Sequence, residues 1–472
     1  MLPAAKIERI ERFVESTSKA VFVRRADSLL MIRPDKLVKL TSSALEILAG
    51  LYTRGRPPAG TVLERLARRL GVEPGRLLAD TERLLDAVGA VLREDYSPRP
   101  ALGFGPFDRK MVRFPTLAEI ALTYGCQNRC AFCYAESPAR PRRARPMTTE
   151  QVKTVAEKIF HQAHVPSLSF TGGEPTLRAD LAELVRHASS VGFRVNLISN
   201  GIRASQMDYA RSLVDAGLDS AQISLEAGDE RLHDSLVGRR GAWRLTVRAI
   251  ENFEKLGIHV HTNTTLCAEN IDRAEEVIEF VSRRLGLRIL SMNMVIRTGS
   301  ALSGRRLEVS YSRVAKRLPA LVDKAREEGV KFVWYSPIPY CIFNPVLHGL
   351  GAKSCACIDG ILSVDPSGQL LPCSSFEQGV GSLLESDFER IWNGRRARWW
   401  REKKFLPPPC RACTDADVCS GACPLYWDAA GSFTELPVRG ADDAGARRRW
   451  ERKRLKSGAF GVRPGTRGGR DG

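Results

Sequence analysis

Three cysteines in a short stretch of the chain have a spacing suited to binding an iron–sulfur cluster. Cys126, Cys130 and Cys133 stand in a C-x3-C-x2-C pattern in ALTYGCQNRCAFCYAE, residues 121–136. A structural zinc ion or a fully ligated 4Fe–4S cube takes four protein ligands. Three thiolates would instead hold three irons of a cube and leave the fourth iron open to a non-protein ligand. The spacing alone also permits a zinc ion that takes its last ligand from a histidine.

Further motifs follow this loop along the chain. FTGGEPTL occupies residues 170–177, Ser199-Asn200-Gly201 comes next, and ISLEA follows at 223–227. Together with the aromatic residue Phe132 before the third cysteine, these motifs resemble the signature of the radical S-adenosylmethionine (radical SAM) superfamily. The resemblance implies that the open iron chelates S-adenosyl-L-methionine. One electron would then cleave this cofactor to a 5′-deoxyadenosyl radical, which abstracts hydrogen from the substrate.

The resemblance also implies which residues contact S-adenosyl-L-methionine. The glycines of FTGGEPTL would let the backbone approach its methionine end, and Glu174 would accept a hydrogen bond from its ammonium group. Later positions match contacts with the ribose and adenine, although a packing role fits them equally well. The expected cofactor-binding residues are Phe132, Gly172, Gly173, Glu174, Pro175, Ser199, Asn200, Ser224 and Val295.

One position departs from the family pattern. After ISLEA, the segment HDSLVGRR places Val237 where the family has an arginine. Arg239 or Arg240 could substitute for that arginine. The choice of a catalytic acid or base depends on how the substrate is held, so the catalytic residues stay unassigned.

A second group of cysteines lies in the last third of the chain. CIDGILSVDPSGQLLPC runs from Cys357 to Cys373, and a C-x2-C-x5-C-x3-C pattern begins at Cys410. These spacings resemble the SPASM extension of radical SAM enzymes, which carries auxiliary iron–sulfur clusters. The resemblance implies a nearer cluster and a farther cluster, the nearer bound by Cys357, Cys373 and Cys423 and the farther by Cys410, Cys413 and Cys419.

The family pattern usually ends with one more cysteine, and this chain has none after Cys423. The farther cluster is therefore expected to have an open iron or an oxygen ligand from Asp415, Asp417 or Asp428. Cys341 and Cys355 are additional metal ligands, assigned to the nearer cluster, with a free thiol as the alternative for Cys355. A zinc ribbon is the alternative for the whole 410–423 segment. Cys267 lies in an apolar stretch and is expected to be a buried core thiol.

The elements that must position these residues alternate between strands and helices from about residue 115. Six such strands with helical crossovers predict a parallel α/β sheet, a partial (β/α)6 barrel whose ligands bind at the carboxyl ends of the strands. This core is expected over 115–300, a helical connection over 301–354, and a small cysteine-rich SPASM domain over 355–430. The expected strands are LAEIALTY, LSFT, RVNLISN, AQISLEA, HVHTNTTL and RILSMNMVI.

Residues 1–97 form a separate expected domain. AVFVRRADSLLMIRP reads as two β runs around an Ala-Asp turn, and Thr41 can cap the first of three helices that follow. This winged-helix-like pattern resembles the peptide-recognition domain typified by the peptide chaperone of pyrroloquinoline quinone synthesis. The resemblance implies that the leader of a precursor peptide adds as a strand to the sheet edge. A DNA-binding winged helix is the alternative, and residues 98–114 are expected to be a linker.

The composition excludes several classes of protein. The 472 residues are 43% hydrophobic, and none of their apolar stretches reaches the roughly 20 residues of a membrane helix. The first residues also lack the shorter apolar region of a secretory signal. A cytoplasmic location is expected, where the clustering of eleven of the twelve cysteines indicates metal rather than disulfides. Part of the net charge of +18 comes from residues 431–472. These are expected to form a disordered basic tail, with nucleic-acid binding as the less favoured alternative.

The sequence as a whole predicts an enzyme that oxidatively modifies or crosslinks a ribosomally made precursor peptide by radical SAM chemistry. Its cofactors would be the first 4Fe–4S cluster, S-adenosyl-L-methionine and one or two auxiliary clusters. A ferredoxin or flavodoxin would supply electrons, and neither a membrane nor nucleic acid is expected as a partner. The alternatives are maturation of a cofactor or of another enzyme's active-site residue, and an iron–sulfur redox-sensing DNA-binding regulator.

Overall fold

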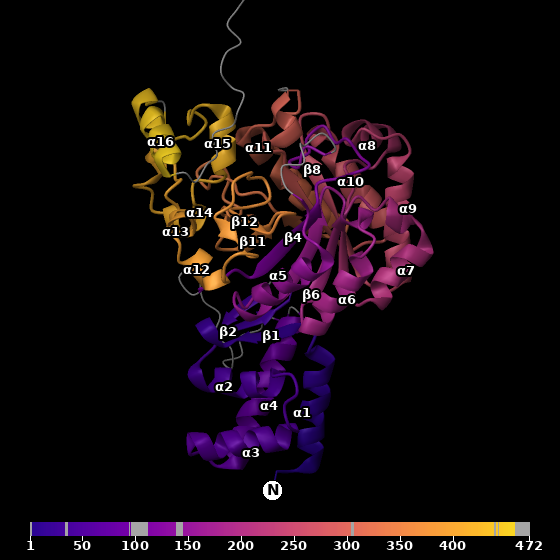
Figure 1. Cartoon of the computed structure of the whole chain (residues 1–472), viewed down its shortest axis with the longest axis vertical. Coiled ribbons are helices and arrows are strands. Elements are labelled where there is room, and N and C mark those ends of the chain that lie inside the picture. Colours follow the sequence, from indigo (N-terminus) through magenta and orange to yellow (C-terminus); the bar gives the residue numbers. More distant parts are fainter. Residues whose placement is uncertain are drawn as a thin grey trace, which may run out of the picture. The chain divides into compact units, whose positions relative to one another are not determined.

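The computed structural model describes residues 2–33, 36–93, 95, 112–137, 145–303, 306–438, 440–441 and 443–457. The chain divides into two compact units, Met1–Arg113 and Phe114–Gly472 (Figure 1). Most of the expected linker, the basic run after the three-cysteine loop and the Gly/Arg-rich end lie outside the described residues. No helix in the described ranges is long and apolar enough to cross a bilayer.

The first unit contains a small sheet and four helices around one apolar core. Thr41 caps its second helix by accepting a hydrogen bond from the backbone N–H of Ala44 at 3.3 Å, which confirms the predicted cap. The structure adds an N-terminal helix and a third strand to the expected elements. In chain order they are α1 Ala4–Thr17, β1 Val21–Arg24, β2 Leu29–Ile32, β3 Lys36–Lys39, α2 Ser42–Tyr52, α3 Ala59–Leu70 and α4 Pro74–Leu92.

The sheet order is β1-β2-β3, with both pairings antiparallel. β3 therefore lies at one edge of the sheet. The backbone N–H of Leu40 donates to the carbonyl of Ser28 at 2.8 Å. Because inward and outward hydrogen-bonding groups alternate along an antiparallel strand, the N–H groups of Leu37 and Lys39 point away from β2.

A buried ion pair closes the turn between β1 and β2. Arg24 donates from Nε and Nη2 to the two carboxylate oxygens of Asp27, each at 2.9 Å. The backbone N–H of Arg113 donates to the same carboxylate at 2.9 Å. The two side chains are almost fully buried. The turn therefore depends on a charge pair that water does not solvate.

Replacing Asp27 with alanine should destabilise the first unit by about 3–5 kcal/mol, because Arg24 would keep a buried charge without its partner. Hydrogen exchange of the β1 and β2 amides in the full chain measures this loss. Arg25→Ala is the control, since Arg25 pairs with Glu46 at the surface and such pairs contribute about 1 kcal/mol or less. Equal protection in the two variants would contradict the assignment.

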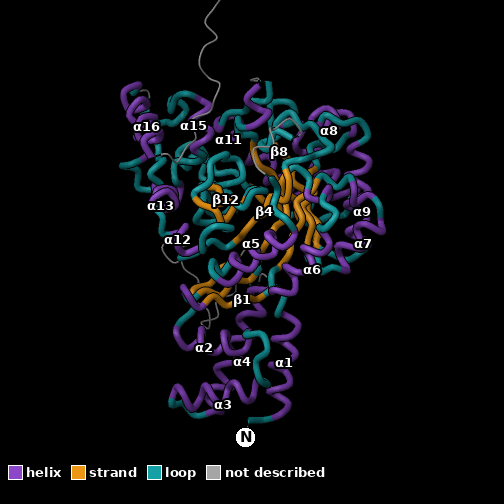
Figure 2. Tube along the Cα trace, in the orientation of Figure 1, coloured by secondary structure: helices purple, strands orange, loops and turns teal. Residues whose placement is uncertain are grey.

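The second unit is built on one large sheet (Figure 2). Six parallel strands lie side by side in chain order, which confirms the predicted parallel α/β core. β10 adds in parallel to β9, and β11 adds in parallel to β4 on the other side. The strands are β4 Leu117–Thr123, β5 Ser167–Gly172, β6 Arg194–Ser199, β7 Ser220–Ser224, β8 His259–Leu266, β9 Ile289–Met294, β10 Lys331–Trp334, β11 Ile361–Val364, β12 Gln369–Leu371 and β13 Gly381–Ser382.

Alternation along the strands separates an apolar face from a polar face. In β8, Val260 and Leu266 are buried in the same core as the helices, whereas Asn263 is half-buried. Asn263 donates to Asn293 of β9 at 2.8 Å and accepts from Ser291 at 3.0 Å. The helices of this unit are α5 Thr149–His161, α6 Leu181–Val191, α7 Met207–Asp215, α8 Glu230–Val237, α9 Ala242–Lys255, α10 Ala274–Glu279, α11 Tyr311–Glu327, α12 Phe388–Trp392, α13 Arg395–Arg401, α14 Ala416–Cys419, α15 Pro424–Ala430 and α16 Ala444–Ser457.

The expectation of a disordered tail from residue 431 is wrong for its described part. α16 carries Trp450, which is 2% exposed and donates from its indole to the carbonyl of Phe405 at 2.7 Å. Arg447 lies over the rings of Phe433 and Trp450. These aromatic side chains pack α16 against the core. The segment contains many arginines, so its sequence predicted a solvated tail instead.

Candidate functional site

The three-cysteine loop directly follows β4, at the carboxyl end of that strand. Burial raises the pKa of the Cys130 thiol, and the neighbouring thiols of Cys133 and Cys126 raise it further. The three sulfur atoms therefore lie close together. Backbone N–H groups point at two of the sulfurs, from Asn128 to Cys126 and from Ser137 to Cys133, each at 3.4 Å. Burial raises the pKa of Cys126 to about 11. A metal that binds this loop must therefore displace thiol protons.

The end of α8 holds this loop in place. The loop N–H groups of Arg129 and Ala131 donate to the carbonyls of Val237 and Leu236 at 2.9 and 3.1 Å. Arg239 donates to the carbonyl of Gln127 at 3.3 Å. Of the two arginines expected to replace the missing family arginine, Arg239 is therefore shown in contact with the loop, and its role toward the cofactor stays a prediction.

The two glycines of FTGGEPTL bring the end of β5 against the same loop. Gly173 donates to the carbonyl of Thr123 at 2.7 Å, and Glu174 donates to the carbonyl of Gly125 at 2.9 Å. A Cβ atom on Gly173 would lie 2.4 Å from the Gly125 carbonyl oxygen, and one on Gly172 would lie 2.2 Å from that of Thr123. Both positions therefore require glycine because they approach the backbone of β4 and the cysteine loop, and the expected approach to the methionine end of the cofactor stays a prediction.

Glu174 ties the ends of β5 and β6 together. Its fully buried carboxylate accepts hydrogen bonds from the N–H and hydroxyl of Thr176, the hydroxyl of Ser199 and the N–H of Asn200, all at 2.7–3.1 Å. Burial raises the pKa of this carboxyl group despite the four donors. Its observed partners are all protein groups, and the expected contact with an ammonium group stays a prediction.

The other expected cofactor contacts lie at the carboxyl ends of neighbouring strands. Asn200 follows β6 and reaches the cysteine loop, where its amide lies 3.7 Å from the Cys126 sulfur. Ser224 ends β7, and Val295 follows β9 with its N–H bonded to the carbonyl of Leu266 at 2.9 Å. Phe132 packs against the main core, and Pro175 is buried beside Glu174.

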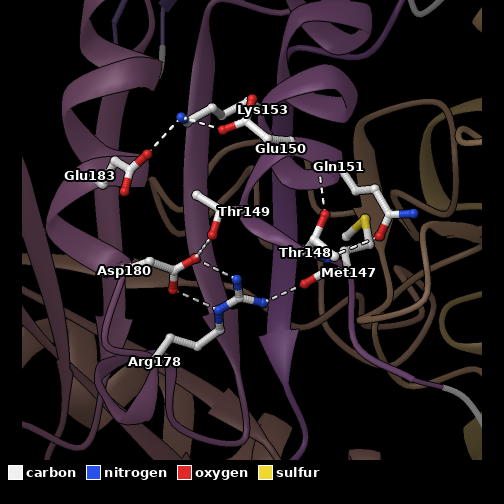
Figure 3. A network of polar contacts seen from close by, with 9 residues as sticks. All are labelled: Met147, Thr148, Thr149, Glu150, Gln151, Lys153, Arg178, Asp180 and Glu183. Carbon is white, nitrogen blue, oxygen red and sulfur yellow. Dashed lines mark hydrogen bonds and ion pairs between the residues drawn. The ribbon is translucent and has the colours of Figure 1, made fainter.

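An ion pair fixes the segment after the glycines to the start of α5 (Figure 3). Arg178 donates to Asp180 at 2.8 Å and to the carbonyl of Met147 at 2.7 Å. Thr149 donates to the same carboxylate at 2.6 Å. Arg178 holds the pKa of Asp180 below its usual range. This network therefore connects the loop after β5 with the chain that continues from the three-cysteine loop.

Four cysteines come together around the expected nearer cluster. The sulfurs of Cys355 and Cys357 lie 3.2 Å apart, and Cys357 also contacts the Cys373 thiol. Burial raises the pKa of Cys423, and the nearby thiols of Cys355 and Cys373 raise it further, so Cys423 lies beside them. Cys355 thus joins the three residues implied by the SPASM resemblance.

Sequence reasoning missed two groups beside these cysteines. Lys403 is 6% exposed and donates to the carbonyl of Cys355 at 2.8 Å and to Asp359 at 3.0 Å. The hydroxyl of Tyr311, also buried, accepts from the N–H of Cys423 at 3.1 Å. No local pattern distinguishes Lys403 from the many surface lysines and arginines, so only its packing identifies it.

The position of Cys341 differs from the sequence expectation, which assigned it to the nearer cluster. The backbone N–H of Tyr340, the residue before it, donates to the Cys419 sulfur at 3.4 Å. Cys341 therefore lies beside the farther cysteines. Cys267, in contrast, is fully buried in the core, as predicted.

The donor sets are rich in cysteine, the ligand type of both iron–sulfur clusters and structural zinc. Within the described ranges, no three His, Cys, Asp or Glu side chains converge closely enough to hold one metal ion. Three thiols in the first loop match a cube with one open iron.

Family models match the two regions that contain these sites. The model described as "Radical SAM superfamily" matches residues 120–281. The model described as "Iron-sulfur cluster-binding domain", SPASM, matches residues 355–414. The 4Fe–4S cluster, S-adenosyl-L-methionine and auxiliary clusters expected from the sequence agree with these two matches.

The match to similar curated proteins extends over most of the length of those proteins. PqqA peptide cyclase of Bradyrhizobium diazoefficiens is 27% identical over 322 residues, which are 66% of this chain and 81% of that protein. AdoMet-dependent heme synthase of Methanosarcina barkeri is 25% identical over 340 residues, which are 69% of this chain and 96% of that protein.

Solved structures share the fold. Streptococcus suis SuiB bound to precursor peptide SuiA has a TM-score of 0.61 at 16% identity and covers 87% of this chain and 95% of its own. Native anSMEcpe with bound AdoMet has a TM-score of 0.52 at 15% identity and covers 74% of this chain and 100% of its own. The SuiB match covers more residues than Phe114–Gly472 contains, so it extends into the first unit.

Proposed function

We propose that this chain, whose residues 120–281 and 355–414 match the radical SAM and SPASM models, is a radical SAM enzyme that oxidatively modifies or crosslinks a ribosomally made precursor peptide. The observation that carries the proposal is the reach of the SuiB similarity into Met1–Arg113, since SuiB is described in complex with a precursor peptide. The similarity to a PqqA peptide cyclase supports the same class of substrate.

In this proposal each part of the chain has its own task. Cys126, Cys130 and Cys133 would hold a 4Fe–4S cluster, which would supply the one-electron chemistry that cleaves S-adenosyl-L-methionine. The residues at the strand ends, from Gly173 to Val295, orient that cofactor. A ferredoxin or flavodoxin in the cytoplasm supplies the electron. The domain boundaries are those expected from the sequence, with a peptide-recognition domain ahead of the partial barrel and the SPASM domain behind it.

The function is tested with anaerobically reconstituted full-length protein, dithionite, S-adenosyl-L-methionine and a small peptide encoded beside the enzyme. Release of 5′-deoxyadenosine together with a peptide that has lost two hydrogens is the expected result. Release of 5′-deoxyadenosine with an unchanged, leader-bound peptide would count against a peptide substrate while leaving the radical chemistry in place.

The exposed edge of β3 offers a place for the leader of the peptide. Its outward N–H groups, at Leu37 and Lys39, could pair with an added strand. Leu37→Pro should remove one such donor and weaken leader binding by about fivefold, because one hydrogen bond is worth about 1 kcal/mol. An edge strand tolerates proline, so the unit should stay folded.

Titration of a fluorescent leader peptide measures this effect. Leu37→Ala is the matched control, because it removes the side chain and keeps the N–H donor. Release of 5′-deoxyadenosine without peptide should be equal in both variants. If Leu37→Ala weakens binding as much as Leu37→Pro, the leader binds through side chains and not through strand addition.

Cofactor maturation is the second candidate function, because AdoMet-dependent heme synthases match a comparable share of this chain. In that case purified enzyme should convert a tetrapyrrole precursor in the absence of any peptide. A requirement for the co-encoded peptide distinguishes the first candidate from the second.

A further inference from the structure

Cys341 is separated in sequence from the residues that the SPASM model matches. It ends the segment SPIPYC, residues 336–341, which follows β10. The matched segment begins only at residue 355. Nothing in the local sequence therefore indicates which of the two auxiliary sites it serves.

The fold places the segment that ends in Cys341 directly on the farther cysteines. The backbone N–H of Tyr340 donates to the Cys419 sulfur at 3.4 Å. The Cys419 thiol in turn faces the carbonyl of Ile338 at 4.0 Å. These two contacts lie on either side of Pro339, and they hold the backbone immediately before Cys341 against Cys419.

Cys341 directly follows Tyr340, so the contact between Tyr340 and Cys419 places the Cys341 backbone beside the farther cysteines. Cys341 is exposed, so core packing does not account for a cysteine at this position. The nearer site, in contrast, already brings four thiols together, with Cys355 as the fourth.

We propose that Cys341 supplies the fourth thiolate of the farther auxiliary cluster, in place of the downstream cysteine that the chain lacks. The proposal rests on the proposed function only in taking both auxiliary sites to hold iron–sulfur clusters. Each auxiliary cluster then has four cysteine ligands and offers no open iron to a substrate. The open position belongs to the first loop alone.

Asp415 is the competing ligand, because it lies between Cys413 and Cys419 and its carbonyl accepts from the backbone N–H of Cys419 at 2.8 Å. A carboxylate from this position would leave Cys341 as a spectator thiol. The two assignments predict opposite outcomes for substitution of Cys341 and of Asp415, so a pair of variants distinguishes them.

The experiment uses full-length protein in which Cys126, Cys130 and Cys133 are replaced by alanine, so that only the auxiliary sites can hold iron. It is reconstituted anaerobically and transferred to thiol-free buffer, and iron, sulfide and the EPR spectrum of the reduced protein are measured. The parent should hold about eight irons per chain. Adding Cys341→Ala should lower this by about one to four irons and change the EPR signal of one cluster.

Two further variants in the same background act as controls. Asp415→Asn and the buried-thiol variant Cys267→Ala should keep the parent's iron content and spectrum. Adding 2-mercaptoethanol to the Cys341→Ala protein should restore the parent signal, because a small thiol can occupy the vacated position. A protein that had merely misfolded would not respond in this way.

Unchanged iron and EPR spectra in Cys341→Ala would overturn the proposal, as would a loss of iron in Asp415→Asn alone. A parent without auxiliary iron would overturn both this proposal and the cluster assignment beneath it. An intact precursor peptide in the activity assay would affect only the proposed function.

Discussion

Replacing Cys130 with alanine should abolish release of 5′-deoxyadenosine from S-adenosyl-L-methionine. Cys130 lies between Cys126 and Cys133 in a loop that offers only three thiols, so the first cluster would be left with two. Loss of an outer partner of a metal ligand already costs about 10–100-fold in metal affinity or activity. Loss of a ligand should therefore lower the rate by more than about 100-fold, as measured by chromatography of the anaerobic reaction.

The matched control for this variant is Cys267→Ala. Cys267 is fully buried and belongs to the apolar core rather than to any thiol set. Its replacement should preserve both iron content and release of 5′-deoxyadenosine. Undiminished cleavage in Cys130→Ala would remove the basis for radical chemistry at this loop, whatever the auxiliary sites contain.

Gly173→Ala should disable the same loop from a different strand. The added methyl group would lie 2.4 Å from the carbonyl oxygen of Gly125 and 2.7 Å from that of Tyr124. Both atoms belong to the backbone, so the loop itself must move. Such overpacking costs about 1–3 kcal/mol, and the shifted loop should lose the first cluster. Release of 5′-deoxyadenosine should then fall by at least about 100-fold.

Gly125→Ala provides a nearby comparison for this effect. A Cβ atom there would meet only Thr123 at 3.4 Å and Leu177 at 3.8 Å, which are ordinary contacts. Its iron content should stay close to that of the unsubstituted protein, whereas that of Gly173→Ala should fall by about one cluster. Equal iron in the two variants would show that the approach of β5 to the loop is not essential.

Several elements were predictable because their signals are local. The six parallel strands and the helix after Thr41 follow from hydrophobic alternation and capping residues that lie within a few positions of each other. β3 and β10 were missed, whereas β1 and β2, which are equally short, could be predicted from the Ala-Asp turn between them. The tail was misjudged because its arginines outnumber the aromatic residues that anchor it.

The role of Glu174 illustrates a signal that was recognised but incompletely interpreted. The motif is expected to form part of a cofactor site, and that role stays a prediction. Its carboxylate nevertheless accepts hydrogen bonds from Ser199 and Asn200, at the end of another strand. These partners are distant in sequence, and their contact arises only when β5 and β6 pair in parallel.

The class of chemistry could be predicted from three local features: three thiols in a loop after a strand, the Gly-Gly-Glu-Pro motif and a cysteine-rich end. Ligand type and short spacing are local properties, so they can be read directly. Only the tertiary structure decided which distant residues meet, such as Ile361 of β11 beside Leu117 of β4, or Cys341 beside Cys419. Those contacts result from sheet pairing and burial across the whole unit, which no short segment encodes.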